Sequence, residues 1–266
     1  MTKMEYAQEI AEAVGGTAQE VKKNNGMVLI GITIKDPESN LAPCVYIDSM
    51  FDEGLSIAEA VNKIKEIIQN NPAPNFDPLT LTDFNKAKQF LSLRLYNADN
   101  EYEIYKSASE YGFDDLIIIP VLTGFMPNAS MKVGESFIET WGVSEEEVFA
   151  TAEANTNADD YSIISMTEIT SGMMGIDPAE IPQPEMDMYI ITNSGRMFGA
   201  YGAIVLKDKL KERFPDGYIV IPSSIHEVIV VPNIGNDDEI RQIINEVNAT
   251  VVAPDEVLGS KPYVFT

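Results

Sequence analysis

His226 is the only histidine of the chain, and its neighbours make it the first candidate for chemistry. Ser223 and Ser224 precede it and Glu227 follows it. An imidazole can act as a general base near pH 7, and a serine that loses its proton to such a base becomes a nucleophile. One hypothesis is therefore a hydrolase that uses His226 with Ser223 or Ser224 and an acid from elsewhere.

A structural interpretation of the same residues is the one we favour. Neighbours along a strand point to alternate faces, and the members of a catalytic triad usually come from distant segments. A turn before a strand accounts for the pattern if the two serines and His226 bond to the backbone and Glu227 stays in solvent. An exposed His226 could instead help to bind a partner.

Metal and nucleotide sites have little support in the sequence. One histidine and one cysteine, Cys44, leave no usual ligand set for zinc. The densest carboxylate clusters, Asp159-Asp160 and Asn236-Asp237-Asp238-Glu239, lack the alternating oxygen ligands and the glycine of an EF-hand loop. There is no P-loop and no dinucleotide fingerprint. We therefore expect no metal and no cofactor.

Between Lys132 and Arg196 lie 63 residues with 13 carboxylates and no lysine or arginine. This acidic tract supplies more than half of a formal net charge of -24. Such an imbalance argues against anionic ligands and direct nucleic-acid binding and favours basic partners. Charge bears on partners and solubility, however, and not on fold.

Three interpretations of the acidic tract stay open. It could be a solvated face that keeps the protein soluble, a surface for a basic protein that includes mimicry of nucleic-acid phosphate, or a source of field around an active site. Helix spacing and the adjoining loop could cluster five of its carboxylates. These candidate partner-binding residues are Glu145, Glu146, Glu153, Asp159 and Asp160.

The composition, with 45% hydrophobic residues over 266 positions, is that of a folded globular protein. Residues 1–16 mix charged and apolar side chains and do not resemble a secretory signal. The longest apolar run, residues 116–126, is shorter than the about 20 residues that span a bilayer. A single cysteine cannot form an internal disulfide. We expect a soluble cytoplasmic protein without a membrane partner.

The elements that must position these residues fall into three portions: an αββα portion at 1–70, a middle portion at 71–187 with the acidic tract, and a ββαββα portion at 188–266. Residues 71–78, rich in proline and asparagine, form the best linker candidate. Helices are expected before Gly15, after Ser56, at 82–91, after Ser144, at 207–214 and at 238–247, and strands at 27–34, 44–47, 116–122, 188–192, 200–206, 218–221 and 228–231.

Strands that arrive in adjacent pairs, rather than singly between helices, favour an α+β fold. We expect a mixed, mostly antiparallel sheet with helices packed on it, and we expect the three portions to form one integrated domain.

Several segments spread over most of the chain form a distinctive pattern, most specific at Ile221-Pro222-Ser223-Ser224-Ile225-His226-Glu227-Val228. The others are Arg94-Leu95-Tyr96-Asn97 and residues 23–26, 141–143, 154–156, 201–203 and 246–250. In these segments the chain resembles a bacterial family of unknown function that is common in gut clostridia and on mobile elements. The resemblance implies a bacterial or phage origin and a single fold, and it carries no catalytic residue, cofactor or substrate.

The leading hypothesis is a non-enzymatic accessory protein whose acidic surface binds a basic protein, such as a nucleic-acid enzyme. The alternatives are the hydrolase centred on His226 and a structural or oligomeric protein without a ligand.

Overall fold

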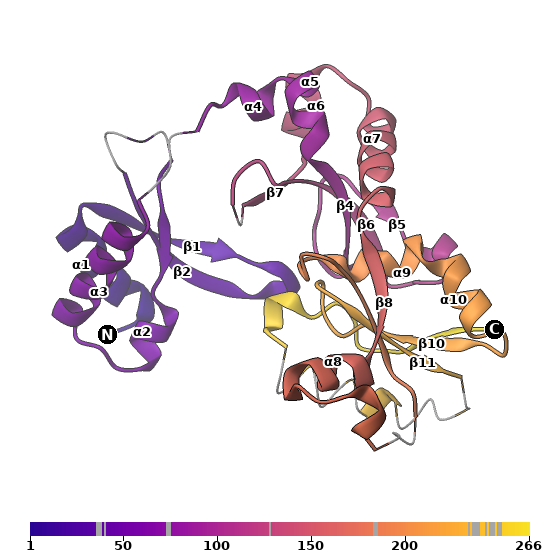
Figure 1. Cartoon of the computed structure of the whole chain (residues 1–266). Helices are drawn as coiled ribbons and strands as arrows, with labels where there is room; N and C mark the ends of the chain where they lie inside the picture. The colour runs from indigo at the N-terminus through magenta and orange to yellow at the C-terminus, as the bar shows by residue number, and fades with distance from the viewer. Residues whose placement is uncertain are drawn as a thin grey trace. The chain divides into compact units, whose positions relative to one another are not determined.

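The computed structural model describes residues 1–35, 39, 41–72, 76–127, 129–182, 186–233, 235, 240–242, 244, 248 and 252–266. The chain forms two compact units, Met1–Pro78 and Leu79–Thr266 (Figure 1). The boundary between the units falls at the end of the predicted linker. The portions predicted at 1–70, 71–187 and 188–266, and their integration into one domain, stay predictions.

The strands of the described residues form three sheets, and every pair of these strands is antiparallel. Helices accompany all three sheets, so the predicted α+β fold is confirmed. No helix formed by the described residues is long and apolar enough to cross a membrane.

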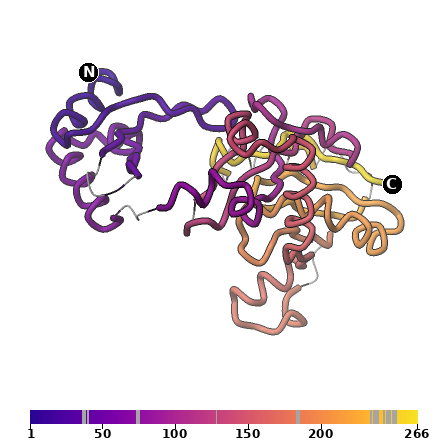
Figure 2. The backbone as a smooth tube through the Cα atoms, turned by 90° about the horizontal axis from the view of Figure 1, so that it is seen from above, coloured from indigo at the N-terminus to yellow at the C-terminus, as the bar shows by residue number. Residues whose placement is uncertain are grey.

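Unit 1 is a three-stranded sheet in the order β1-β2-β3, packed against helices. Its core contains Ile10, Ile32 and Ile64, all fully buried, from a helix, a strand and a second helix. The far end of the β1–β2 hairpin extends beyond the helices of this unit (Figures 1 and 2). The elements are α1 Lys3–Val14, β1 Gly16–Lys22, β2 Val28–Ile34, β3 Cys44–Tyr46, α2 Asp48–Asp52 and α3 Ile57–Asn70.

Local sequence sets the helix ends of unit 1. The Thr2 and Ser56 hydroxyls accept from the backbone amides of Glu5 and Glu59, whose carboxylates bond back, so α1 and α3 both begin with a capping box. Gly15 ends α1 in the left-handed region, at φ 70°. Strand β1 was not predicted, because its residues lack apolar alternation. It lies at an edge and pairs along its whole length with β2.

Unit 2 contains two sheets. In the first, the central strand β6, predicted at 116–122, is buried over all but its last residue and is therefore covered on both faces. One side of β6 pairs with β4, and the other pairs with the short strands β5 and β7. Pro120, which has no N–H to donate, lies in the gap between those two strands. The strands are β4 Leu91–Asn97, β5 Lys106–Ser107, β6 Leu116–Thr123 and β7 Ser130–Lys132.

The second sheet of unit 2 has the order β12-β10-β11-β9-β8. Its strands are β8 Tyr161–Ser165, β9 Tyr189–Asn193, β10 Tyr218–Ile221, β11 Val228–Pro232 and β12 Tyr263–Phe265. The main helices of unit 2 are α4 Leu79–Thr82, α5 Phe84–Ala87, α6 Glu135–Trp141, α7 Glu145–Asn157, α8 Met166–Met174, α9 Gly202–Val205 and α10 Lys207–Arg213.

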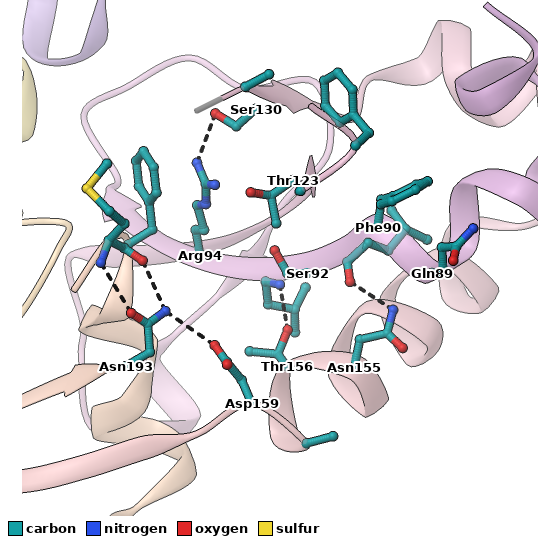
Figure 3. A pocket seen from close by; sticks show the side chains of 18 of the residues that line it. Gln89, Phe90, Ser92, Arg94, Thr123, Ser130, Asn155, Thr156, Asp159 and Asn193 are labelled. Atoms are coloured by element: carbon teal, nitrogen blue, oxygen red, sulfur yellow. Dashed lines mark hydrogen bonds between the residues drawn. The ribbon is translucent and has the colours of Figure 1, made fainter. Parts of the chain in front are cut away.

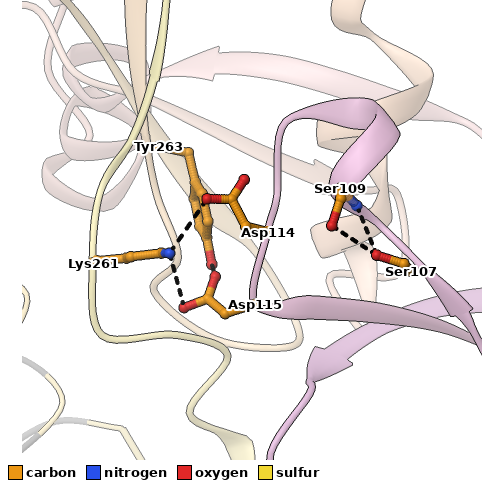
Figure 4. A network of polar contacts seen from close by, with 6 residues as sticks. All are labelled: Ser107, Ser109, Asp114, Asp115, Lys261 and Tyr263. Carbon is orange, nitrogen blue, oxygen red and sulfur yellow. Dashed lines mark hydrogen bonds and ion pairs between the residues drawn. The ribbon is translucent and has the colours of Figure 1, made fainter.

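A polar and aromatic junction connects the two sheets of unit 2 (Figure 4). The Tyr263 hydroxyl, on β12, donates to Oδ1 of Asp115 at 2.6 Å, just before β6. Lys261 lies 3.6 Å from both Asp114 and Asp115, and the rings of Phe113 and Tyr263 meet edge to face. Burial and the Asp115 contact raise the pKa of Tyr263. The junction therefore holds the first sheet of unit 2 against the second.

The strand predicted at 200–206 is wrong. This segment is a 3-10 turn, η5 Gly199–Tyr201, followed by helix α9. A Cβ at Gly199 would lie 2.6 Å from the Asn193 amide nitrogen, and one at Gly202 would lie 2.5 Å from the Tyr161 ring. The two glycines thus let a helical segment lie directly against β8 and β9, which alternating apolar residues alone do not indicate.

Two further helix predictions need correction or restriction. The helix predicted at 82–91 breaks at Asp83, whose carboxylate accepts from the Asn85 amide and starts α5, and the chain enters β4 at Leu91. The Asn236-Asp237-Asp238-Glu239 cluster lies wholly outside the described residues, and the helix predicted at 238–247 lies partly outside them. Within this predicted helix, Ile240 and Ile244 are helical and buried.

Unit 1 has its own core and capped helices, so residues 1–78 expressed alone should fold. We expect a cooperative thermal unfolding transition by circular dichroism. Ile64→Ala in the same fragment should lower the free energy of unfolding by about 2–5 kcal/mol, because Ile64 is fully buried. A fragment that unfolds without a cooperative transition would contradict this prediction.

Candidate functional site

The five predicted partner-binding carboxylates lie on α7 and just after it. Ser144 caps α7 by accepting from the Glu147 amide at 3.2 Å, so Glu145 and Glu146 occupy the first turn. Glu153 lies seven residues after Glu146, on the same helix face. Asp159 and Asp160 follow the helix, and all five residues are exposed.

These carboxylates differ in what they contact. None of the ion pairs formed among the described residues includes one of the five. The pKa of Glu146 is lowered by its own backbone amide and by Ser144, and Lys106 contributes a smaller attraction. Asp159 accepts from the Asn193 side chain at 3.2 Å and from the Asp160 amide at 2.9 Å. Glu145, Glu146 and Glu153 thus form an exposed helix face, whereas Asp159 also braces a turn.

His226 lies in the loop before β11 with both ring nitrogens engaged. Nδ1 accepts from the Phe198 amide at 3.0 Å, and Nε2 lies 3.2 Å from Oε1 of Glu256. This geometry assigns the proton of the neutral ring to Nε2. The Ser224 hydroxyl accepts from the His226 backbone amide at 3.1 Å.

The serines do not complete a catalytic arrangement. Ser223 and Ser224 are buried, and no hydrogen bond among the described residues joins either hydroxyl to the imidazole. The geometry gives the hydrolase hypothesis no support. No group of three or more metal-ligating side chains occurs in the part of the chain that the structure describes.

Unit 2 contains a cavity of about 820 Å³ that the sequence did not indicate (Figure 3). Its walls come from β4, the segment between β6 and β7, the end of α7, β8 and the turn after β9. Arg94 and Asp159 are the two charged residues among the described ones that line it. Phe90 and Phe125 supply an aromatic wall, with ring centroids 6.4 Å apart.

Arg94 is the central residue of this cavity. It lies in the middle of β4 and is only 4% exposed. Its Nη1 donates to the Ser130 hydroxyl at 3.2 Å, and its guanidinium carbon lies 3.4 Å from the centroid of the Phe198 ring. Burial lowers the pKa of Arg94, and the neighbouring Tyr96 opposes that shift. No carboxylate of the described residues forms an ion pair with it.

Phe198, the residue that contacts Arg94, ends a tight turn formed by residues 193–198. Arg196 and Phe198 have φ of 50° and 56°, a left-handed conformation that costs a bulky residue about 1–2 kcal/mol. The Asn193 side chain bonds both backbone groups of Met197, at 3.2 and 3.0 Å. His226 then holds the next amide, that of Phe198. Strain of this kind persists only where surrounding contacts enforce it.

Sequence reasoning missed Arg94 and Phe198 as site residues. The available indication was a single cation inside the apolar strand Leu91–Asn97, where a charge is expected to serve a purpose. No local pattern marks Phe198, because its role depends on contacts with β4 and with His226.

Thr156 fixes α7 to the cavity wall. Its hydroxyl accepts from the Leu93 amide at 2.8 Å, and Pro120, opposite Leu93, offers its carbonyl to Val133 instead. Thr156→Val should lower the free energy of unfolding by about 1–3 kcal/mol, because it leaves a buried amide without an acceptor. Urea denaturation measures the change.

Thr151→Val is the matched control. Thr151 makes the same bond to the carbonyl four residues earlier, but among the described residues its hydroxyl accepts no hydrogen bond from another element. An equal loss of stability in both variants would show that the Leu93 contact contributes nothing.

Comparison with known proteins gives a family and no function. No curated protein and no solved structure matches the chain. A family of unknown function, DUF5688, matches residues 2–266, which is nearly the whole chain. The chain therefore belongs to this family of unknown function.

Proposed function

We propose that this chain is a non-enzymatic binding protein that holds a small carboxylate in the cavity, against Arg94. The observation that carries the proposal is a buried arginine that lines a cavity of about 820 Å³ and has no carboxylate partner among the described residues. The only imidazole of the chain, that of His226, contacts Phe198 and Glu256 through its two nitrogens, which favours binding over acid–base catalysis.

The energetic argument concerns desolvation. Burying a charged group without a counter-charge costs on the order of several kcal/mol. The hydrogen bond to Ser130 and the stacked Phe198 ring offset part of that cost at Arg94. A ligand carboxylate would complete the pairing, since the planar guanidinium presents donors that match two carboxylate oxygens.

The lining favours a ligand with one negative charge and an apolar body. The cavity volume lies within the roughly 300–1,000 Å³ of small-molecule sites. Phe90, Phe125 and Met126 offer apolar surface, while one cation accompanied by Asp159 suits a monocarboxylate better than a phosphate dianion. The expectation that anionic ligands are disfavoured rested on net charge, whereas a partly buried site responds mainly to its nearest charges.

Arg94→Met tests this function. Removing a buried charge that has no carboxylate partner among the described residues should leave the melting temperature unchanged or raise it. The same variant should bind benzoate roughly ten- to a hundredfold more weakly than the natural chain, because it loses a charged hydrogen-bonded pair. Calorimetry with benzoate and with its neutral analogue benzamide measures binding, and benzamide should bind weakly to both proteins.

Arg213→Met is the control with the same change in net charge. Arg213 is exposed on α10 over the Tyr189 ring and does not line the cavity. It should leave benzoate binding unchanged. The proposal fails if benzoate does not bind the natural chain, or if Arg94→Met binds it equally well.

A second candidate function is the recruitment of a basic protein, as for a bacterial or phage accessory protein of the cytoplasm that engages a nucleic-acid enzyme. The observation that favours it is the exposure of Glu145, Glu146 and Glu153 without an ion pair among the described residues. Opposite charges steer such partners together over distances set by ionic strength.

Replacing Glu145, Glu146 and Glu153 with glutamine should abolish retention of a basic protein on the immobilised chain at low salt, because their field is lost. The control replaces Glu9, Glu12 and Glu20, three exposed carboxylates of unit 1, and changes net charge equally. Retention from a bacterial lysate is compared at low and physiological salt. Equal loss in both triple variants, or retention indifferent to salt, would contradict a specific α7 surface.

A further inference from the structure

His226 has an unusual position for the sole histidine of a chain, because it contacts the cavity wall but does not line the cavity. Its ring lies 4.9 Å from the Phe198 ring, centroid to centroid. Phe198 in turn covers the Arg94 guanidinium at 3.4 Å. The three side chains therefore form a continuous row of contacts from a loop of the second sheet to β4 of the first, with the His226 and Phe198 rings tilted by 49°.

The hydrogen bond at Nδ1 of His226 restrains the backbone of Phe198. The backbone of Phe198 is in the left-handed region, so a restraint is needed to keep its ring over Arg94. Nδ1 of His226 accepts the Phe198 amide, and the His226 carbonyl accepts the next amide, that of Gly199, at 2.8 Å. Two successive amides of the strained segment are thus held by one residue.

The opposite side of the imidazole is also fixed. Nε2 faces Glu256, which belongs to the 3-10 turn η6 Pro254–Glu256. The carbonyl of Glu256 accepts the Ile225 amide at 2.9 Å, so the backbone of this turn also anchors the loop that carries His226. The ring therefore contacts the cavity wall at Phe198 through Nδ1 and the turn η6 at Glu256 through Nε2.

We propose that His226 is a positioning residue for ligand binding: through Nδ1 it holds Phe198 on Arg94 and so keeps the guanidinium oriented toward the cavity. This inference rests on the proposed carboxylate-binding function. It assigns the only histidine of the chain a part in binding affinity without contact with the ligand.

Two substitutions separate the two ring nitrogens. The Asn side-chain oxygen can occupy the place of Nδ1, so His226→Asn keeps an acceptor for the Phe198 amide and loses the Glu256 contact. The longer Gln reaches the place of Nε2, so His226→Gln keeps a donor toward Glu256 and loses the acceptor. Both variants remove the imidazole, and each retains one of its two contacts.

Benzoate affinity is then measured by calorimetry on the full chain. We expect His226→Asn to bind within a few fold of the natural chain and His226→Gln to bind about tenfold more weakly, the effect of one lost hydrogen bond. Melting temperatures are compared to verify that both variants fold. Equal affinity in the two variants would overturn the role of Nδ1.

A measurement without ligand tests the same hydrogen bond. Because the chain has one histidine, its imidazole nitrogen resonances need no assignment among residues. In ¹⁵N spectra of the neutral ring we expect Nε2 to carry the proton and Nδ1 to accept a hydrogen bond. A proton on Nδ1 would overturn the inference.

The two measurements distinguish the ways in which the inference can fail. If benzoate does not bind the natural chain but the spectra show an accepting Nδ1, the proposed function fails and so does the role in binding that depends on it. If benzoate binds through Arg94 while His226→Gln binds as tightly as His226→Asn, the proposed function stands and the positioning role alone is wrong.

Discussion

The contact between the Arg94 guanidinium and the Phe198 ring is the interaction that positions the cation lining the cavity of unit 2. It joins β4 of the first sheet to the turn that follows β9 of the second sheet, and it places a cation where water is largely excluded. Three features hold the Phe198 ring in this contact. They are the left-handed backbone at Phe198, the hydrogen bonds of the Asn193 side chain to Met197 and the acceptor nitrogen of His226. Each of these supports the position of one aromatic ring.

The electrostatics of the protein differ between its surface and this cavity. The acidic face of α7 projects into solvent, where salt screens charges beyond about 8 Å at physiological ionic strength. Arg94 is buried, so its interaction with a nearby ligand is screened much less. A chain with a net charge of -24 can therefore present a local site for an anion. Net charge describes long-range attraction and solubility, and it does not identify what a desolvated pocket binds.

Much of the fold follows from local patterns, which succeeded where one element's own residues decide its structure. The helices that begin after Ser56 and Ser144, the strand β6 and the α+β class were all predicted. The errors occurred where neighbours decide. Strand β1 forms because β2 offers a complementary edge, and α9 forms because Gly199 and Gly202 permit close packing on β8 and β9.

The sequence by itself determined the acid-only middle region, the exposed helix that carries Glu145, Glu146 and Glu153, and the choice of His226 as a residue of interest. It could not determine what His226 touches, because Phe198 and Glu256 lie 28 and 30 positions away from it in the chain. It also could not indicate a cavity around Arg94, since the wall is assembled from segments that are distant in the sequence. Charge and periodicity are properties of local residue order, whereas burial and pairing arise only when the sheets of unit 2 pack together.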